Sequence, residues 1–379
     1  CAKPEAWSFV ERLLLAARRE EGLRQAILEP LGEAHPEAFR RILQLVLDEG
    51  RARFSSVVRA ADIWFGLGWD SASGKHVHEQ MALAHACLTD EQARDAALGG
   101  KDGGAAYLAL WSIAFDDLDQ AAERAEPLMR HAKPEIRFAA VHLLARAGLP
   151  HLAPLMVNAL RDADLRVAAR AADYFAVVNE DAVDRGAAFQ AVEELFRRVS
   201  NAKARSLKPI IWPWTARKLG TREVGAALVH LADINTAERL MGHLDKFDAE
   251  DRATVARYLG RVQWIADDEG RRDTSAAQSV PHPMSPISEG ARLALVKLLG
   301  DTTQVVRHAA FDGLRASPVK PDEAERLESL LDRKNSDLRT AGIHRLAKQE
   351  DAAALLSAQR LLADRNAERR RAGMALLES

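Results

Sequence analysis

Five short windows of this sequence share one pattern, and that pattern restricts the chain to folds built from stacked helices. Each window starts with polar residues, continues with an arginine and a pair of small residues, and ends in an apolar helical stripe. A period of about thirty residues indicates one repeated supersecondary unit. The windows are KPEIRFAAVHLL (133–144), DADLRVAARAAD (162–173), TQVVRHAAFDGL (303–314), NSDLRTAGIHRL (335–346) and NAERRRAGMALL (366–377), and their arginines are Arg137, Arg166, Arg307, Arg339 and Arg370.

Each window carries the signals of a helix that packs against a neighbouring helix. Pro134 suits a first helical turn, where its missing N–H costs nothing. Asp164 and Asn366 can accept hydrogen bonds from the free N–H groups of a helix start. The small pair lets another helix approach closely, and further helical segments precede the windows, as at 151–160 and 322–331. We therefore expect an all-α fold, a right-handed α-α superhelix of helix pairs.

Composition agrees with a helical fold and argues against several functions. Ala, Leu and Arg are abundant, and these residues lose little entropy in a helix. The formal net charge of -2 gives no overall attraction to nucleic acid or an anionic membrane, so such binding would need a local patch. Two distant cysteines, Cys1 and Cys87, form no disulfide framework, and no apolar run approaches the roughly 20 residues of a membrane helix. We expect a cytoplasmic location.

One low-complexity stretch divides the helical pattern. Residues 267–290 contain three prolines and cannot sustain a helix. We predict an N-terminal helical array over 1–266, a mobile loop or linker over 267–290, and a C-terminal repeat block over 291–379. That block stops inside an unfinished repeat, without the polar capping helix that a solenoid needs. We therefore expect a truncated block, and a start at Cys1 leads us to expect a missing upstream portion.

The arginine and small-pair signature resembles HEAT repeats, which implies an α-solenoid and hardly constrains function. The resemblance is clear at the five windows and weak between about 175 and 300. In addition, YLALWSIAF (107–115), KPEIRFAAVHLLA (133–145) and IWPWTARK (211–218) look like the N-terminal region of large bacterial HEAT-repeat proteins. Those proteins carry an uncharacterised C-terminal domain and are sometimes called molybdate-regulator-like. This second likeness implies that the chain is part of a longer protein.

The most suggestive segment for binding is residues 197–222, which contains eight basic residues and no acidic one. Indole rings among these cations could stack on bases, and phosphate groups or an acidic protein would be natural ligands. The alternative is a solenoid elbow, in which prolines break the helix, the indoles pack and the basic residues are solvated or paired. The candidate binding residues are Arg197, Arg198, Lys203, Arg205, Lys208, Trp212, Trp214, Arg217, Lys218 and Arg222.

A second stretch, GLGWDSASGKH at 66–76, comes close to a phosphate-binding loop. The Walker pattern needs four residues between its glycines, and here five separate Gly68 from Gly74. His76 stands where a magnesium-binding Ser or Thr belongs, and the preceding segment, 53–65, reads as a helix instead of a strand. We interpret the stretch as a turn between helices, with Lys75 pointing at water.

Two further clusters contain residue types that could carry chemistry. HVHEQMALAHAC (76–87) holds metal-capable His76, His78, Glu79, His85 and Cys87, but one helix cannot wrap an ion with ligands spread over ~10 Å. FDDLDQ (115–120) offers three aspartates, which a boundary between helices explains equally well as caps. For both clusters an ordinary structural role is the expected one.

The sequence as a whole favours binding over catalysis. No Ser/His/Asp, Cys/His or glycine-rich nucleotide pattern stands out, so we predict no catalytic residue, no cofactor and no metal. We expect a scaffold that docks a protein partner or another domain of a longer chain. The alternatives are binding of nucleic acid or another polyanion through 197–222, and a HEAT-type DNA glycosylase that uses Asp116 near Trp111 or the region of Trp212 and Trp214.

Overall fold

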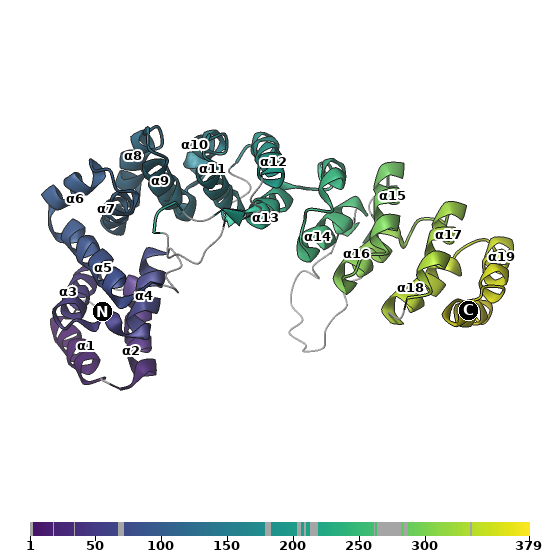
Figure 1. Cartoon of the computed structure of the whole chain (residues 1–379), viewed down its shortest axis with the longest axis horizontal. Coiled ribbons are helices and arrows are strands. Elements are labelled where there is room, and N and C mark those ends of the chain that lie inside the picture. Colours follow the sequence, from purple (N-terminus) through teal and green to yellow (C-terminus); the bar gives the residue numbers. More distant parts are fainter. Residues whose placement is uncertain are drawn as a thin grey trace. The chain divides into compact units, whose positions relative to one another are not determined.

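The structure is a computed structural model that describes most of the chain in two compact units. The described residues are 3–17, 19–33, 35–66, 72–178, 183–202, 206–207, 210–212, 219–260, 262–263, 282–283, 287–333 and 336–379. Unit 1 is Cys1–Leu231 and unit 2 is Ala232–Ser379. Both consist mainly of helices (Figure 1).

Unit 1 contains thirteen α-helices among its described residues. Helices α7, α9, α11 and α13 form a row in which each contacts the next, and α6, α8, α10 and α12 pack on that row. The α-helices are α1 (Pro4–Ala16), α2 (Glu21–Leu28), α3 (Pro36–Asp48), α4 (Ser55–Phe65), α5 (Gly74–Thr89), α6 (Glu91–Leu98), α7 (Gly103–Asp116), α8 (Leu118–Leu128), α9 (Pro134–Ala147), α10 (Ala153–Ala159), α11 (Leu165–Ala172), α12 (Arg185–Asn201) and α13 (Thr221–Leu231).

Short 3-10 helices and one short strand pair complete unit 1. The 3-10 helices are η1 (Glu29–Glu33), η2 (Arg51–Arg53), η3 (Pro150–Leu152) and η4 (Asp173–Ala176). Strands β1 (Ser206–Leu207) and β2 (Leu219–Gly220) pair antiparallel, with Ser206 opposite Gly220. The sequence showed no strand here, because a two-residue pairing has no alternation to detect.

The core of unit 1 lies where α7 and α9 are buried on nearly all sides. Helix α9 lies between α7 and α11, and α7 lies between α5 and α9, so both sequences are apolar around most of the circumference. The hydroxyl of Tyr107, which is fully buried, donates to the carbonyl of Phe65 at 2.6 Å. The indole N–H of Trp111 donates to the carbonyl of Trp64 at 2.9 Å. These two bonds satisfy buried polar atoms and fix α7 to the end of α4.

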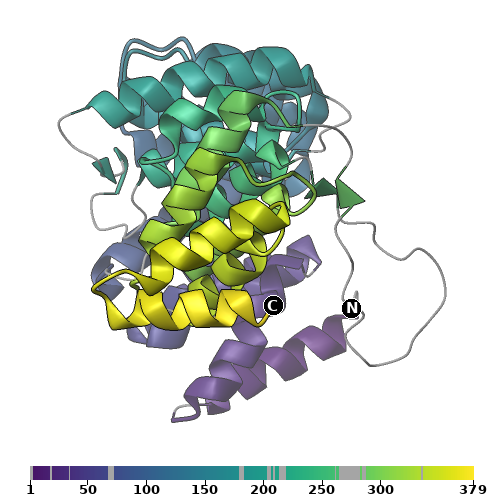
Figure 2. The same cartoon turned by 90° about the vertical axis from the view of Figure 1, so that its right-hand side faces the viewer.

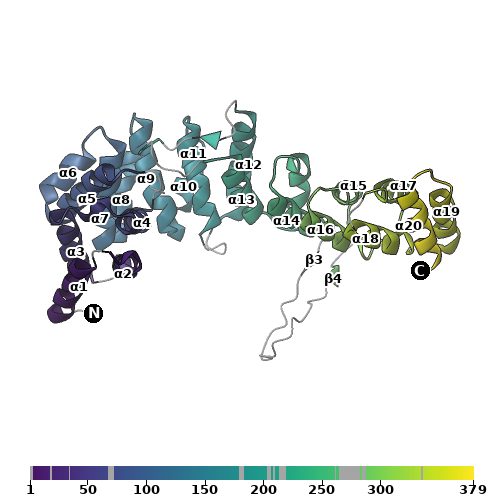
Figure 3. The same cartoon turned by 60° about the horizontal axis from the view of Figure 1, so that its bottom comes forward.

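Unit 2 repeats the same arrangement in two layers. Within each pair, α15 packs on α16, α17 on α18 and α19 on α20. The second helices of the pairs form a continuous row with α14, which Figures 2 and 3 show from the end and from below. The elements are η6 (Ala237–His243), α14 (Ala249–Leu259), β3 (Val262–Gln263), β4 (His282–Pro283), α15 (Glu289–Leu298), α16 (Gln304–Leu314), α17 (Pro321–Leu330), α18 (Ser336–Leu346), α19 (Asp351–Leu362) and α20 (Ala367–Leu377).

Close packing within the row depends on glycine at one point. A Cβ placed on Gly260 would lie 2.3 Å from the Cα of Gly313, so only glycine fits between α14 and α16 there. The small pairs in the repeat windows serve the same purpose, since Ala309 and Ala310 are both almost fully buried on α16. The backbones can therefore approach closely, as the sequence predicted.

Three of the repeat arginines, Arg137, Arg307 and Arg339, contact a carboxylate of the following repeat, whereas Arg166 pairs with Asp164 at the start of its own helix. Arg307 donates from Nη1 to the carbonyls of Asp301 and Thr302, which precede its own helix, and from Nη2 to Asp337 of the following repeat at 2.6 Å. Arg252 does the same toward Asp301, at 2.9 Å from Nε. The arginine thus satisfies loop carbonyls and holds the next repeat in register.

The structure confirms the predicted helical repeats. All five windows are helices, namely α9, α11, α16, α18 and α20, and the preceding helices predicted at 151–160 and 322–331 are α10 and α17. Asp164 and Asn366 cap their helices by accepting from Arg166 N and Glu368 N. Most of the predicted loop 267–290 lies outside the described residues. Its last two residues are helical, because Ser288 caps α15 and Glu289 begins it.

Candidate functional site

The basic segment is described at only four of its ten candidate residues. Lys203, Arg205, Lys208, Trp214, Arg217 and Lys218 lie outside the described residues. Arg198 donates to the carbonyls of Leu160 and Asp162 at 3.2 and 2.7 Å, so it satisfies the loop before α11. Arg197 pairs with Glu193 at 2.6 Å, and Arg222 lies exposed in the first turn of α13.

Trp212 is a buried core residue. Its side chain is 5% exposed and its ring meets Tyr107 edge-on at 5.7 Å. Its φ is +53°, a left-handed conformation that costs a non-glycine residue roughly 1–2 kcal/mol. The packing of the indole against α7 must outweigh that cost. For Arg198 and Trp212 these contacts favour the elbow interpretation, while an anion-binding role for the remaining residues of the segment stays a prediction.

The glycine-rich stretch 66–76 joins two helices, as the sequence indicated. Gly66 ends α4 in the left-handed conformation with φ +67°, and Ser73 caps α5 by accepting from His76 N. Residues 67–71 lie outside the described residues. The side chain of Lys75 is 82% exposed and lies 3.9 Å from Glu79 within α5. The segment before the stretch is helix α4, so no strand leads into it as a phosphate loop requires.

The two polar clusters have structural roles in the described parts of the chain. No group of three His, Cys, Asp or Glu side chains is placed to hold a metal ion there. Cys87 is buried, and this burial raises the pKa of its thiol to about 11. Asp117 caps α8 by accepting from Gln120 N, and Asp116 is bound by Arg40. The predicted boundary between helices is therefore present at 116–118.

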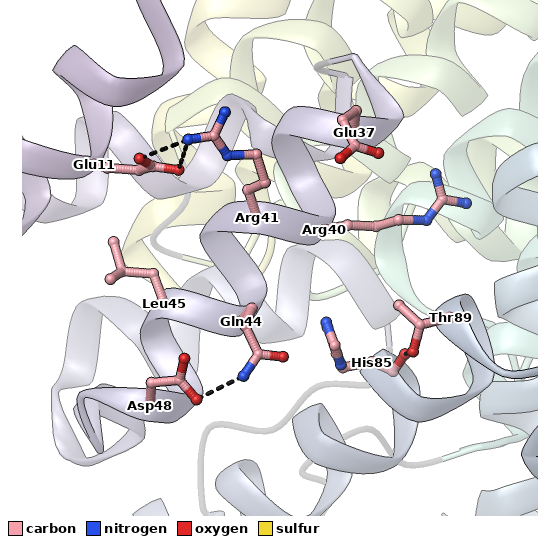
Figure 4. Close-up of a pocket in the computed structure, with 9 residues that line it drawn as sticks. All are labelled: Glu11, Glu37, Arg40, Arg41, Gln44, Leu45, Asp48, His85 and Thr89. Carbon is pink, nitrogen blue, oxygen red and sulfur yellow. Dashed lines mark hydrogen bonds and ion pairs between the residues drawn. The ribbon is translucent and has the colours of Figure 1, made fainter. Parts of the chain in front are cut away.

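A depression that the sequence analysis did not single out lies on helices α1, α3 and α5. Its volume is about 470 Å³, and it is wide open to solvent. Figure 4 shows Glu11 and Arg41 on one side of α3 and His85 with Thr89 on the other. The lining residues are Glu11, Glu37, Arg40, Arg41, Gln44, Leu45, Asp48, His85 and Thr89. We call this set the α3 depression.

Ion pairs fix the charged side chains of the α3 depression. Arg40 donates from Nη2 to both carboxylate oxygens of Asp116 on α7, each at 2.7 Å. Arg41 lies 2.8 Å from Glu11 of α1. Its guanidinium carbon also lies 5.5 Å from the ring centre of Trp7 on the same helix, within the range of a cation–π contact. Both guanidinium groups are already held in one orientation, so they lose little conformational entropy when a ligand binds.

The pKa of His85, on the α5 side of the depression, departs from its ordinary value. Burial lowers the pKa of His85 below its ordinary value of 6.5; Asp48 acts in the opposite direction, and the charge of Arg40 adds to the lowering. The imidazole is therefore neutral at pH 7. A neutral imidazole can act as a base, and the one hydroxyl among the lining residues is that of Thr89, which donates to the carbonyl of His85 at 2.8 Å.

The sequence contained a signal for this depression. Glu37, Arg41, Gln44 and Asp48 recur at spacings of three and four along PEAFRRILQLVLD, so they share one face of α3. A polar stripe of this kind usually means an ordinary solvated helix face. The depression forms because α1 and α5 lie beside this face, and the sequence of α3 alone does not predict those neighbours.

In the described parts of the chain, no helix combines the length and apolarity needed to cross a bilayer.

Comparisons with known proteins give weak structural likenesses and one family. An engineered protein is 17% identical, with 97% of this chain and 98% of that chain covered and a TM-score of 0.40. Kap121p is 12% identical, with 99% of this chain and 40% of Kap121p covered and a TM-score of 0.48. The chain thus spans well under half of Kap121p. The complex of CpcE and CpcF of phycocyanin lyase from Nostoc sp. is 16% identical, with 76% and 93% covered and a TM-score of 0.31.

These TM-scores are too low to add to the fold described above, and no curated protein matches the chain. A family model agrees with it from end to end. Because the model described as a family of unknown function (DUF5724) matches residues 1–379, the chain belongs to that family.

Proposed function

We propose that this chain is a non-catalytic scaffold whose α3 depression docks a protein partner or another domain of a longer chain. The observation that supports this most is the pair of adjacent arginines on α3. Arg40 and Arg41 are each held by a carboxylate from a different helix, Asp116 of α7 and Glu11 of α1. Arginine is enriched among the residues that dominate interface energetics, and a preorganised arginine loses less entropy on binding.

The shape and polarity of the depression also favour a macromolecular partner. Small-molecule sites are usually concave and mostly apolar, and they enclose most of the ligand. The α3 depression is open, so it would leave much of a small ligand in contact with solvent. With Glu11, Glu37 and Asp48 around two arginines, it presents both signs of charge, which suits a partner surface of mixed charge.

A comparative binding experiment tests this function. The chain and its Arg40→Glu and Arg41→Glu variants would be immobilised and exposed to the same cell extract, with retained proteins quantified by mass spectrometry. The matched control is Arg130→Glu, because Arg130 is also paired with a carboxylate, Glu126, but at the exposed end of α8. We expect specific proteins to be lost from both α3 variants and kept by the control. Identical retention by all four chains would refute docking at this surface.

Several expectations from the sequence remain proposals beside this one. The alternative of polyanion binding through 197–222 now rests on the other eight candidate residues, six of which lie outside the described part of the chain. A glycosylase role for Asp116 has no support from its contacts, since Arg40 occupies both carboxylate oxygens. The cytoplasmic location, the division at 267–290 and the likeness to molybdate-regulator-like proteins also stay proposals.

A further inference from the structure

Unit 2 contains a buried cluster of two arginines and one glutamate. Glu323 of α17, whose side chain is 1% exposed, accepts from Arg345 Nε at 2.8 Å and from Arg292 Nη2. Arg345 also donates from Nη1 to the carbonyl of Ser317 at 2.6 Å. One carboxylate faces two guanidinium groups, so the buried cluster carries a net charge of one positive unit.

One donor of this cluster lacks a partner. Arg345 is 3% exposed, and its Nη2 is buried without a hydrogen bond to any described residue. Leaving such a group unsatisfied costs about 1–3 kcal/mol, and more when the group is charged. Native proteins rarely keep a buried charged donor without a partner, so the uncompensated positive charge of this cluster favours an anion close by.

Arg345 lines a cavity of about 340 Å³ between α16 and α18. The cavity is separate from the α3 depression, which lies in unit 1. Besides Arg345, its charged lining residues are Arg315, Lys348 and Asp312, and Asp312 is paired with Arg315. The buried cluster and these lining residues together hold an excess of two positive charges. The other residues of the wall are Phe311, Ala341 and His344.

We propose that this cavity binds a phosphoryl group. A phosphate ester carries about −1.5 to −2 charges at pH 7 and three strong acceptor oxygens, which matches the excess charge better than a single carboxylate does. The donors are the Lys348 ammonium and the Arg315 guanidinium, and the positive charge of the buried cluster behind Arg345 adds to their attraction for an anion. The Arg315–Asp312 pair does not oppose this, because its arginine side chain is 54% exposed and exposed pairs are weak. The volume accommodates inorganic phosphate or a phosphorylated side chain.

Binding of inorganic phosphate and of O-phosphoserine tests the proposal. Both would be titrated into the full chain by calorimetry at constant ionic strength, with acetate as the carboxylate probe. The variants are Arg315→Ala and Lys348→Ala, which leave the buried cluster intact. Arg371→Ala is the matched control, because Arg371 is likewise exposed and paired three residues away, with Glu368. We expect saturable phosphate binding, weakened about tenfold by either cavity variant and unchanged in the control.

The outcomes separate the possible ligands and can overturn the proposal. Tighter binding of O-phosphoserine than of phosphate would identify a phosphorylated protein as the source of the group, and equal binding would identify free phosphate. Absence of saturable binding, equal weakening by Arg371→Ala, or acetate binding as tight as phosphate would each contradict a phosphoryl site. None of these results bears on partner docking at the α3 depression, because the two sites share no residue.

Discussion

Arg137 and Asp162 join two successive repeats through two parallel hydrogen bonds. Arg137 donates from Nε to Asp162 Oδ2 at 2.7 Å and from Nη2 to Oδ1 at 2.9 Å. The third donor, Nη1, reaches the carbonyls of His131 and Ala132 at 2.9 and 3.1 Å, just before its own helix. The hydrogen bonds to Asp162 raise the pKa of Arg137, which favours its charged form. This geometry links one loop to the next.

Replacing Arg137 with alanine should therefore destabilise unit 1 strongly. The change leaves Asp162, which is only 10% exposed, without its cation and leaves two loop carbonyls without a donor. We expect a loss of about 3 kcal/mol in the free energy of unfolding, measured by urea denaturation with circular dichroism. Arg137→Lys should recover only part of it, because an ammonium cannot form the two-pronged bond.

The control for this prediction is Arg130→Ala, in the turn that follows α8. Arg130 pairs with Glu126 at 3.3 Å, but its side chain is 75% exposed, so the pair should contribute less than about 1 kcal/mol. If the two alanine variants were equally stable, the repeat arginine would have no special role.

The equivalent contact in unit 2 predicts a dependence on pH. Burial raises the pKa of Asp301, but hydrogen bonds from Arg252 and from the backbone N–H of Thr303 outweigh it, and the pKa lies below its ordinary value of 3.8. Because the carboxylate is bound more tightly in its charged form, it stabilises the fold fully at pH values above its ordinary pKa. This contribution is lost as the pH falls through the lower pKa of the native state. We expect Asp301→Asn to be less stable at pH 7 and to lose less stability between pH 4 and pH 2.

Urea midpoints measured across this pH range check the prediction. Asp351→Asn is the control, because Asp351 is exposed in the first turn of α19, where substitutions typically change stability by less than about 0.5 kcal/mol. An unchanged pH profile in Asp301→Asn would mean that the Arg252 contact does not depend on the carboxylate charge.

The fold was predictable because the signals of each repeat lie close together in the sequence. The window around Arg307 contains its arginine, its Ala309–Ala310 pair and its apolar stripe within twelve residues. Arg252 makes the same contacts but escaped detection, because Ala253 is followed by Thr254 and the small pair is missing. The contact depends on the position of the arginine in the helix, and the pair only signals how close the neighbour lies.

The candidate sites were less predictable because they arise between elements distant in sequence. Arg40 meets Asp116 across 76 residues, and Arg292 meets Glu323 across 31 residues. Each of these residues looks like an ordinary surface charge in its own helix. Trp212 shows the converse: an indole amid basic residues suggested stacking on bases, but in the structure it fills a space beside Gly104.

The Trp212 contact predicts that Gly104→Ala destabilises the protein. A Cβ at Gly104 would lie 2.4 Å from Trp212 Nε1 and 3.0 Å from Cε2, so the indole would have to move. Overpacking of this kind costs about 1–3 kcal/mol. Hydrogen exchange should also increase in α7. Gly22→Ala is the control, since a Cβ there has nothing within 4 Å, and it should leave stability unchanged or slightly raised. Equal stability of both variants would argue against a tightly packed Trp212.

Cys87 should react very slowly with thiol reagents in the native protein. Burial raises the pKa of its thiol to about 11, so about a thousandth of it is thiolate at pH 8. We expect alkylation by iodoacetamide, followed at this residue by peptide mass spectrometry, to be at least about 100-fold slower than in urea. The native rate should keep rising with pH up to about 11. Rapid native labelling at pH 8 would show that the thiol is accessible and ionised.

Salt dependence distinguishes polyanion binding from protein docking at the basic segment. If residues 197–222 bind nucleic acid, retention on DNA or RNA should fall steeply with salt, because each phosphate contact releases counterions. Replacing Arg205, Lys208, Arg217 and Lys218 together with alanine should then flatten the plot of log affinity against log salt by roughly 0.9 per lost contact on duplex DNA.

A control with the same loss of charge makes this test specific. Alanine at Lys75, Arg130, Lys320 and Arg371 also removes four cations, and each of these is exposed and paired with a carboxylate. We expect that variant to keep the wild-type slope, because dispersed cations form no continuous field for a phosphate backbone. No retention of the wild-type chain at ~50 mM salt would exclude nucleic-acid binding, since electrostatic attraction is strongest at low ionic strength. If both variants flattened the salt dependence equally, the effect would come from the loss of net charge and not from a binding site at 197–222.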